Sequence, residues 1–345
     1  MFVKDLFCIS PQRTIDESFF NQDVISYSGN KYTSVEPSYA GLIPNGLLRR
    51  MGKAVRMGIG AGITLVNNNP KVHGIILGTA NGGLEDCIKF LNQIVKYEEG
   101  NLTPTNFIQS TPNSAAGNLA IMSGNTNYNI THVHQGLAFE NALLDAGLLF
   151  EEDNAESVLV GGIEEISEHN YNIDFLSGFY KTEVVDSENL LQSKTKGTVC
   201  GEGAAMFILD KNINSGIRIV DIGQIQSQNI KEVTNKLKQF LELNTFSVSD
   251  IDAVMLGFNG DTDDNNWYNS VLDRLFPDTG VFTFKNLSGD YPTVSSFATW
   301  LSVMILKGKT IPLAAIYKPG TSDIRNILIY NSYRNQHGFI LLEKK

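Results

Sequence analysis

Short apolar runs that end at glycines alternate along the chain with segments of helical spacing. Buried strands are predicted at Val72–Gly83, where the run leads into a Gly-rich turn, and at Ser157–Glu165 and Cys200–Asp210. The segment after Gly83 has the spacing of an amphipathic helix, with one face made of Ile88, Leu91, Ile94 and Val95. Apolar strands between helices predict an α/β fold whose sheet is covered on both faces.

The same pattern restarts in the second half of the chain. In chain order it predicts a strand Gly216–Ile225, a helix Asn229–Asn244, a strand Ile251–Gly260, a helix Trp267–Phe276, a short strand Phe282–Asn286, a helix Val294–Leu306, and strands Ile327–Tyr330 and Gly338–Leu342. The first of these helices would turn Ile230, Val233, Leu237, Phe240 and Leu241 inward. No Pro/Ser-rich linker divides the chain. We predict two similar halves, residues 1–210 and 211–345, fused into one compact unit with the seam near Lys211–Gly216.

The stretch from Asn113 to Gly147 is laid out like the site of an acyl-transfer enzyme. An Asn-Ser-Ala-Ala-Gly turn opens one helix, and a short segment reaching Val133 then leads into a second helix that begins near His134 or Gln135. A strand-to-helix turn places one side chain at the positive end of a helix, where a thiolate or oxyanion is stabilised. Gln135 takes that place, and its carboxamide is not a nucleophile.

Composition narrows the function classes. Hydrophobic residues make up 42% of the 345 residues and the formal net charge is −10 without any basic run, which argues against nucleic acid and anionic membranes as partners. No apolar run reaches the roughly 20 residues needed to span a bilayer, and the N-terminus lacks the apolar core of a signal peptide. Cys8, Cys87 and Cys200 are few and widely spread, which is typical of a reducing compartment. We expect a cytoplasmic protein without a structural zinc site or a disulfide framework.

Three segments carry a family resemblance. VCGEGAAMFIL (Val199–Leu209), PNSAAGNLAI (Pro112–Ile121) and VLVGGIEE (Val158–Glu165) resemble segments of β-ketoacyl synthases, in the same order and at similar spacing. With IPNGLLRRMGKAVRMG (Ile43–Gly58), the chain looks like the chain-length-factor-type ketosynthase relatives found with aryl polyene and flexirubin pigment pathways. The resemblance implies the thiolase-like fold, a duplicated βαβαβαββ unit in an α-β-α-β-α sandwich, normally dimeric.

Active members of that family need a nucleophilic cysteine, which forms the acyl thioester. Alignment by the apolar stripe of Phe139, Ala142, Ala146 and Leu149 puts Gln135 at the cysteine position. An alternative register, which pairs Gly136 with a family glycine, would put Val133 there. We favour Gln135 because the stripe constrains more residues. Neither register supplies a thiol.

The family's two catalytic histidines are also missing. The stretch that matches the first histidine contains none, and an ungapped count places Gly257 there, with Asn259 two residues further on. At the second position Lys285 and Gly289 are kept, but Asp290 replaces the histidine. A carboxylate there has the wrong sign to stabilise an enolate.

The family's glycine-rich gating loop reads NSYRNQHG here (Asn331–Gly338). Asn331 and Ser332 are kept, while the flexible glycines have been replaced. Loss of glycines from positions of positive φ predicts a changed or stiffer loop, and Asn335 is a candidate for lining a tunnel or an interface.

Other residues offer little chemistry of their own. Cys200 and Cys87 are expected to be small buried or packed side chains. His132 and His134 bracket Val133, so on an extended segment they would point the same way. With Asp290 they could bind a metal or form an acid/base pair, although polar lining of a vestigial pocket is the favoured interpretation. Gly260–Asn266 lacks the glycine and glutamate of an EF-hand and is predicted to cap a helix. We predict no metal and no cofactor.

The favoured function is that of a chain-length-factor-like subunit. The resemblance implies an inert subunit that pairs with an active ketosynthase, shapes the acyl tunnel and works on acyl carrier protein thioesters. Two alternatives stay open: a malonyl decarboxylase of the glutamine-for-cysteine type, and a homodimeric ketosynthase-like module that binds an acyl chain. Pro112–Gly124 and Thr131–Phe139 are the candidate interface and tunnel segments. The individual candidates are Asn113, His132, His134, Gln135, Phe139, Asn259 and Asn335.

Overall fold

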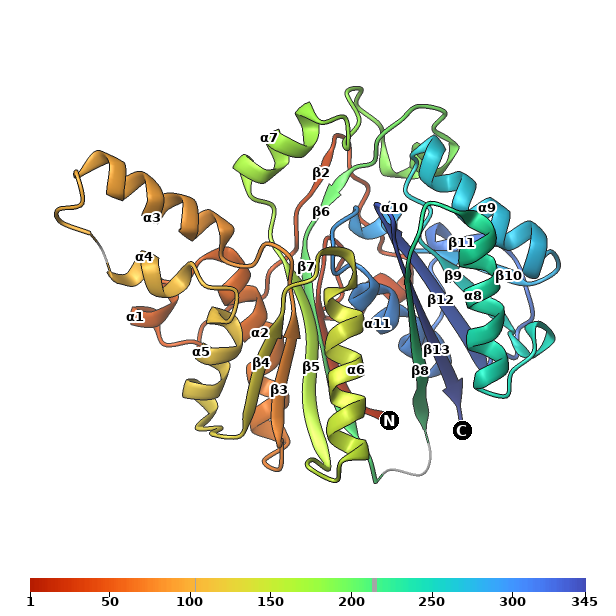
Figure 1. Cartoon of the computed structure of the whole chain (residues 1–345), viewed down its shortest axis with the longest axis horizontal. Coiled ribbons are helices and arrows are strands. Elements are labelled where there is room, and N and C mark those ends of the chain that lie inside the picture. The colour runs from red at the N-terminus through yellow and green to blue at the C-terminus, as the bar shows by residue number, and fades with distance from the viewer. Residues whose placement is uncertain (103, 213–215) are drawn as a thin grey trace.

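The first half of the chain forms a repeating pattern of strands and helices (Figure 1). A computed structural model describes residues 1–102, 104–212 and 216–345. The main elements are β1 (Phe2–Ile9), α2 (Lys53–Asn68), β3 (Gly74–Gly78), α5 (Ser114–Ser123), β4 (Tyr128–His132), α6 (Ala138–Glu151), β5 (Ser157–Glu164) and β7 (Gly203–Asp210). The pattern β1-α2-β3-α5-β4-α6-β5-β7 is the predicted βαβαβαββ unit.

The second half repeats that order. Its elements are β8 (Ile217–Gln226), α8 (Ile230–Leu243), β9 (Ala253–Leu256), α9 (Thr262–Leu275), β10 (Gly280–Thr283), α11 (Ser295–Leu306), β12 (Asn326–Tyr333) and β13 (Gln336–Lys344). The strand order is β4-β3-β5-β7-β1 in the first half and β10-β9-β12-β13-β8 in the second, with β11 (Ile316–Lys318) added outside β10. The duplication is therefore present in the topology. The division at residue 210 stays a prediction, and residues 213–215 of the expected seam lie outside the described part of the chain.

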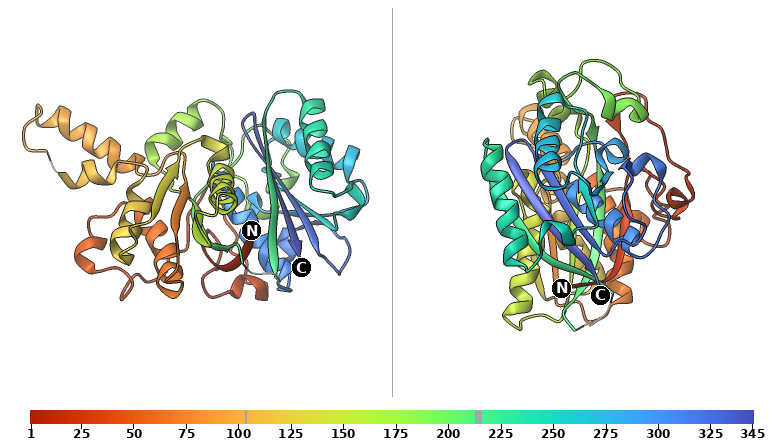
Figure 2. Two further views of the ribbon diagram at one scale, coloured as in Figure 1. Left: turned by 60° about the horizontal axis from the view of Figure 1, so that its bottom comes forward. Right: turned by 90° about the vertical axis from the view of Figure 1, so that its right-hand side faces the viewer.

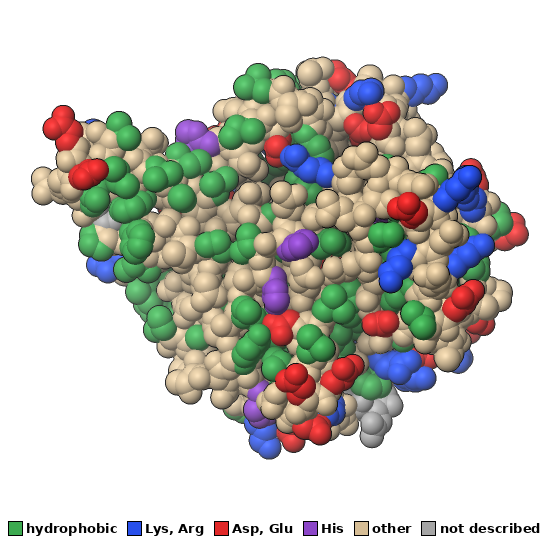
Figure 3. All heavy atoms as spheres, in the orientation of Figure 1, with side chains coloured by type: hydrophobic (Ala, Val, Ile, Leu, Met, Phe, Trp, Pro, Cys, Tyr) green, Lys and Arg blue, Asp and Glu red, His purple; other side chains and the backbone are tan. Residues whose placement is uncertain are grey.

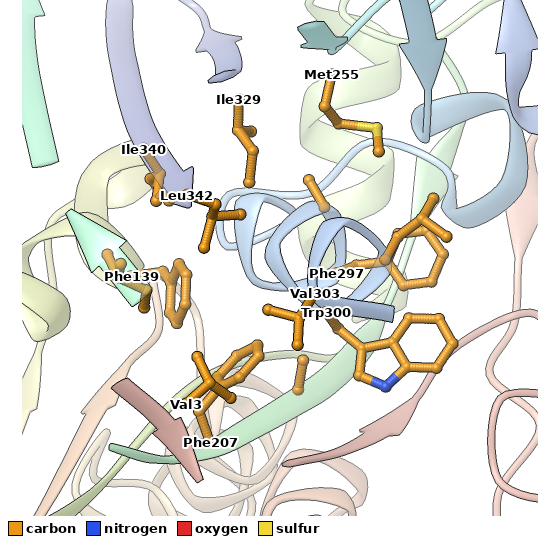
Figure 4. Close-up of a cluster of buried hydrophobic side chains, with 14 of the residues drawn as sticks. Val3, Phe139, Phe207, Met255, Phe297, Trp300, Val303, Ile329, Ile340 and Leu342 are labelled. Atoms are coloured by element: carbon orange, nitrogen blue, oxygen red, sulfur yellow. The ribbon is translucent and has the colours of Figure 1, made fainter. Parts of the chain in front are cut away.

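The two halves stand side by side, with α6 and α11 packed between them (Figures 1 and 2). β1 meets β8 only at the Phe2–Arg218 pair, which joins the strands of both halves into one hydrogen-bonded order. All residues of α11 are buried, and Figure 4 shows Phe297, Trp300 and Val303 among side chains from both halves. The outer faces are covered by α2 and α5 on one side and by α8 and α9 on the other. This is the predicted layered sandwich.

Three local expectations were incomplete. The strand β1 was not predicted because polar residues interrupt its apolar pattern. The helix α2 was not predicted because it contains three glycines, which lower helix propensity. Those glycines permit close packing: a Cβ on Gly58 would lie 2.5 Å from Ile163, and one on Gly60 would lie 2.3 Å from Tyr39. The predicted strand Phe282–Asn286 is wrong beyond Thr283, because Lys285–Ser288 form the short helix α10.

A pair of helices projects from the body of the molecule (Figure 1). They are α3 (Leu84–Lys96) and α4 (Pro104–Gln109), and we call them the arm. The amphipathic helix predicted after Gly83 is present, but its apolar face is only partly covered. Ile88 and Ile94 are half-buried, while Leu91 is 53% exposed and Val95 is 80% exposed. The arm therefore leaves an apolar surface without a partner in the single chain.

The remaining elements are short. They are α1 (Asn45–Leu48), α7 (Glu168–Leu176), the pair β2 (Lys31–Tyr32) and β6 (Cys200–Gly201), and the 3-10 turns η1 (Ser18–Asn21), η2 (Gln135–Leu137), η3 (Ser187–Gln192), η4 (Val248–Asp250) and η5 (Leu313–Ala315).

Candidate functional site

The strand-to-helix turn predicted around Gln135 is present. β4 ends at His132, and η2 leads from Gln135 directly into α6. Gln135 has a φ of +48°, a left-handed conformation that is unusual for a residue other than glycine and is found at sharp functional turns. Val133 lies before the turn and is 52% exposed. The geometry thus puts Gln135, with an exposed side chain, in the turn itself.

The backbone amide of Gly136, the residue after Gln135, already has a hydrogen-bond partner within the chain. The backbone N–H of Gly136 donates to Gln336 Oε1 over 2.9 Å. A Cβ on Gly136 would lie 2.4 Å from Tyr333 Cβ, so the β12–β13 hairpin sits directly against the helix start. A free helix N-terminus can bind an oxyanion. Here the Gly136 amide already has an internal acceptor, Gln336 Oε1.

The predicted gating loop is a tight hairpin turn. Tyr333 ends β12, Gln336 begins β13, and Arg334 between them has a φ of +56°. Arg334 Nη2 lies 2.7 Å from Asp174 Oδ1 on α7, and its guanidinium lies 4.7 Å from the centre of the Phe179 ring. The tip of the turn is therefore held in place by an ion pair and a cation–π contact, and a change relative to the family's gating loop stays a prediction.

An ion pair fills the centre behind the turn. Lys285 Nζ lies 2.9 Å from Asp290 Oδ1, and the two side chains are 0% and 1% exposed. Asn259 Nδ2 donates to Asp290 Oδ2 over 3.0 Å and to Asp264 Oδ2 over 2.9 Å. Burial raises the pKa of Asp264 to about 6, against the opposing effect of the Lys285 charge. The negative charge of Asp290 is thus balanced within the chain by the ammonium group of Lys285.

Asn259, and not Gly257, lies beside Asp290. The Gly257 amide bonds to Tyr330 O just after β9, and a Cβ there would lie 2.6 Å from the Tyr268 hydroxyl. The ungapped alignment therefore points to Gly257, which has no side chain and no room for one. A shift of two residues points instead to Asn259, whose side chain contacts Asp290. Neither position carries an imidazole.

The two histidines of the turn do not converge. His132 Nε2 lies 2.9 Å from Asp145 Oδ2 on α6, and the same carboxylate accepts from the Tyr128 hydroxyl over 3.1 Å. His134 is exposed at the surface, outside the strand. Asp290 is buried against Lys285, so the three-residue metal site considered from the sequence is wrong. Across residues 1–102, 104–212 and 216–345, no group of three or more His, Cys, Asp or Glu is arranged to hold a metal ion.

The remaining candidates divide into exposed and buried residues. Asn113 is exposed at the start of α5, where its Oδ1 accepts from Thr131 Oγ1 over 2.8 Å, and Asn335 is exposed at the hairpin tip. Phe139 and Asn259 are fully buried, and Phe139 packs against Phe207 with 5.8 Å between ring centres. Both are buried within the single chain, and their assignment as tunnel or interface residues stays a prediction.

Two smaller expectations are confirmed. Cys200 is 6% exposed, and burial raises the pKa of its thiol to about 12, which makes it an inert packed side chain. Asp261 caps α9 by accepting from the backbone N–H groups of Asp263 and Asp264, as predicted for the Gly260–Asn266 loop.

Sequence reasoning missed two buried glutamates. Glu140 lies in the first turn of α6 with 0% exposure, and neither carboxyl oxygen has a hydrogen-bond partner among the described residues. Burial raises its pKa to about 7. Glu164 at the end of β5 accepts from Thr79 Oγ1 over 3.1 Å, and burial raises its pKa to about 8. A signal was available for both, because each interrupts an otherwise apolar buried stretch.

No acyl-sized chamber opens at the cavity beside α5. This cavity is lined by Thr111, Pro112, Ser114 and Thr131 among others, and its volume is about 10 Å³. A space of that size holds at most about one water molecule. This cavity is therefore too small to hold an acyl chain.

Apolar side chains gather on the surface around the turn and the arm. β4 is the end strand of its sheet. The large apolar residues exposed near it and on α5, α6 and the arm are Leu91, Val95, Phe107, Ile108, Ile121, Tyr128, Val133 and Leu148. Figure 3 shows apolar side chains crowded over the arm and the neighbouring face, with few charged groups between them. Large exposed apolar patches of this kind mark interaction sites.

Comparison with known proteins gives the family context. Residues 27–174 match the model of the beta-ketoacyl synthase N-terminal domain. No curated protein matches the sequence. In the described residues, no helix combines the length and apolar character required to cross a membrane.

The fold matches solved structures over the whole chain. One is the ishigamide ketosynthase/chain length factor, at 13% identity and a TM-score of 0.81, covering 100% of this chain and 98% of that one. Another is the ketosynthase ApeO in complex with its chain length factor ApeC from Xenorhabdus doucetiae, at 13% identity and a TM-score of 0.77, with coverage of 100% and 98%. A third is the AntDE:AntF complex of a type II polyketide carrier protein with its ketosynthase, at 15% identity and a TM-score of 0.76, with coverage of 100% and 99%. The predicted fold class is confirmed.

Proposed function

We propose that this chain, whose residues 27–174 match the beta-ketoacyl synthase N-terminal domain and whose fold matches solved ketosynthase structures, is a non-condensing, chain-length-factor-like subunit that pairs with an active ketosynthase. One observation carries the proposal: an uncovered apolar surface surrounds the Gln135 turn, while the centre behind that turn is filled. The solved structures with this fold include complexes of a ketosynthase with its chain length factor, which supports the same arrangement.

Condensation by this chain alone conflicts with its chemistry. Acyl transfer needs a thiolate or an equally activated nucleophile, and the carboxamide of Gln135 is neither. Decarboxylation needs hydrogen-bond donors free to stabilise an enolate. The ammonium of Lys285 is already in contact with Asp290 and with the carbonyl oxygen of Ser332, and the Gly136 amide donates to Gln336. The donors nearest the turn are therefore committed to the chain's own groups.

The pairing surface would consist of β4, the start of α6 and the arm. Burying an exposed side chain of valine or leucine size contributes about 1.5–3 kcal/mol, so a few such residues suffice for a stable interface before association costs. Ile121 and Val95 are 81% and 80% exposed and are the strongest candidates for central contacts. In such a pair Asn113, His134 and Gln135 would face the partner, and the acyl tunnel would form between the two chains.

The wider setting is part of the same proposal. The partner would act on acyl carrier protein thioesters in a fatty-acid or polyketide-type pathway of the aryl polyene or flexirubin kind, in the cytoplasm. The carrier-protein complex among the structural relatives supports the thioester substrate class. Of the two alternatives, the decarboxylase is disfavoured because Asn259 and Asp290 stand where it would need imidazoles. The homodimeric acyl-binding module would use the same surface, so the composition of the complex, homodimer or heterodimer, distinguishes it from the leading proposal.

Reconstitution tests the proposal directly. The chain, an intact ketosynthase encoded beside it, and the two together are assayed with malonyl and acyl carrier protein. We expect condensation only from the mixture, and no release of CO₂ by the chain alone. Ile121→Asp should abolish activity of the mixture, while Leu243→Asp, equally exposed at the end of α8, should leave it unchanged. Carbon dioxide release by the isolated chain would instead support the decarboxylase.

A further inference from the structure

A buried carboxyl group lies in the first turn of α6, directly behind the Gln135 turn. Glu140 is 0% exposed, and its two oxygens have no hydrogen-bond partner among the described residues. Burying a carboxyl group without a partner costs free energy, and the cost is far larger for the ionised form. What packs against Glu140 therefore decides what its ionisation would do to the structure.

The hairpin of β12 and β13 makes room for this carboxyl group. A Cβ on Gly338 of β13 would lie 2.5 Å from Glu140 Oε1 and 2.9 Å from Glu140 Cδ. A residue with a side chain at position 338 would therefore collide with the carboxyl group, which rests directly on the backbone of the strand. Glu140 and β13 are packed so closely that neither can shift without the other.

The same face of β13 holds the Gln135 turn closed. Positions two apart on a strand lie on the same face, so Gln336 and Gly338 both face the start of α6. Gln336 Oε1 accepts from the backbone N–H of Gly136 over 2.9 Å, and Tyr333 of the same hairpin lies directly against Gly136. A displacement of β13 at Gly338 would therefore reach the hydrogen bond at the turn, two residues away.

The nearby cation does not belong to Glu140 alone. Burial raises the pKa of Glu140 from 4.5 to about 7, and Ser295 on α11 and the ammonium of Lys285 on α10 oppose that rise only in part. Lys285 Nζ lies 2.9 Å from Asp290 Oδ1, so its charge is already paired with another carboxylate. Ionised Glu140 would therefore lack a counter-ion of its own.

The other neighbours along the hairpin are neutral. The residues that pair with Gly338 on the adjoining strands are Asn331 of β12 and Gln224 of β8, and both are uncharged. Burial lowers the pKa of His337, the residue before Gly338, so its ring is neutral as well. A negative charge on Glu140 is thus relieved by contact with water, and the exposed Gln135 turn lies at the same end of α6.

We propose that Glu140 is a proton-operated latch: with its proton it leaves the β12–β13 hairpin closed against the Gln135 turn, and without its proton it opens that contact to reach water. The closed form holds the proton more tightly, because only the open form lets water solvate the carboxylate. Rising pH therefore favours the open turn from about 4.5, the ordinary pKa, to about 7, and no further above that. The latch belongs to the isolated chain and does not depend on the proposed pairing function.

Hydrogen exchange of the full chain tests the latch. Exchange of peptides covering residues 133–140 and 333–338 is followed by mass spectrometry at several pH values, and each rate is divided by the intrinsic rate at that pH. Protection should fall about tenfold per pH unit up to about pH 7 and then level off, since each opening releases one proton. The helix α11, buried along its whole length, reports global unfolding in the same sample. The turn should exchange faster than α11 at every pH.

Two neutral variants and one control complete the test. Glu140→Gln and Glu140→Leu remove the ionisation, so protection of the turn should no longer change with pH, and the second serves if the first fails to fold. Glu151→Gln, at the exposed end of the same helix, should keep the tenfold steps of the parent. Protection in the parent that does not change with pH would overturn the proposal. The parent's slope in a folded Glu140 variant, or a turn that exchanges no faster than α11, would do the same.

Discussion

Two neighbouring regions of the molecule differ in what they bury: one buries polar groups, and the other exposes apolar ones. In the centre behind the Gln135 turn, the buried carboxylate of Asp290 contacts both Lys285 and Asn259. The Gly136 amide beside it donates a hydrogen bond to Gln336. A short distance along the chain, Val95 and Ile121 stand almost fully exposed on the arm and on α5. The polar groups of the first region are buried and paired, and the apolar side chains of the second are exposed to solvent.

The two regions therefore contribute to different properties, the polar centre to the stability of the isolated chain and the apolar surface to assembly with a partner. A filled polar centre contributes to folding only while every charge keeps its partner. An exposed apolar surface contributes nothing to the isolated fold and acquires its value when a partner covers it. Substitutions in the two regions should therefore be distinguishable by the free energy of unfolding of the isolated chain. The four predictions below run from the largest expected change in that quantity to the smallest.

Removing the buried cation should have the largest effect. Lys285→Met leaves Asp290 at 1% exposure without its charge partner, and breaking one side of such a buried pair costs about 3–5 kcal/mol. Urea denaturation of the isolated chain measures it. The double variant Lys285→Met/Asp290→Leu should recover much of the loss, since the uncompensated charge is gone. A single-variant loss below about 1 kcal/mol would show that the centre is not a sealed ion pair.

Glu140 should make stability depend on pH. Burial raises its pKa from 4.5 to about 7, so the folded chain binds more protons than the unfolded chain between those values. Stability relative to a Glu140→Gln variant should then fall as pH rises from about 4.5 to about 7, by an amount on the order of 3 kcal/mol, and level off above. Denaturation of both proteins across that range tests it, and parallel curves would contradict it.

A methyl group at the helix start should cost less. Gly136→Ala places a Cβ 2.4 Å from Tyr333 Cβ and forces the hairpin away from the turn, which corresponds to about 1–3 kcal/mol of overpacking. The matched control is Gly147→Ala on the same helix, where a Cβ meets nothing within 4 Å. That change should be neutral or stabilising by up to about 1 kcal/mol. Equal effects of the two substitutions would refute close hairpin packing.

Changes on the arm should leave the isolated chain almost untouched. Leu91→Ser and Val95→Ser alter exposed positions and should shift the free energy of unfolding by less than about 0.5 kcal/mol. Each should still weaken binding of the ketosynthase partner about tenfold or more, because each removes apolar area that the partner would bury. Leu243→Ser serves as the exposed control outside the surface and should change neither quantity. A partner affinity that ignores the arm would remove α3 from the interface.

The sequence predicted the structure well where the hydrophobic pattern alone determines the element. Strict apolar runs predicted β3, β5 and β7, and the stripe of α6 placed Gln135 in its turn. The centre was harder, because the contact between Lys285 and Asp290 depends on how α10 folds, and the expected strand at Phe282–Asn286 concealed that helix. The sequence could therefore predict that Asp290 stands at a family histidine position, but not that it forms half of an ion pair.

The arm shows a second limit of sequence reasoning. Helical spacing predicted an apolar face at Leu91 and Val95, and that face exists. Periodicity identifies which residues share a face but not what covers them, so burial against the chain's own core and burial against a partner give the same pattern. Only the tertiary arrangement distinguishes a core helix from a docking helix.

The most direct test of the account is the mass of the species formed when the purified chain is mixed with the neighbouring intact ketosynthase, measured by size-exclusion chromatography with light scattering. We predict a 1:1 complex with the parent chain and separate proteins with Ile121→Asp. A stable homodimer of this chain that does not exchange with the ketosynthase would contradict the proposed function.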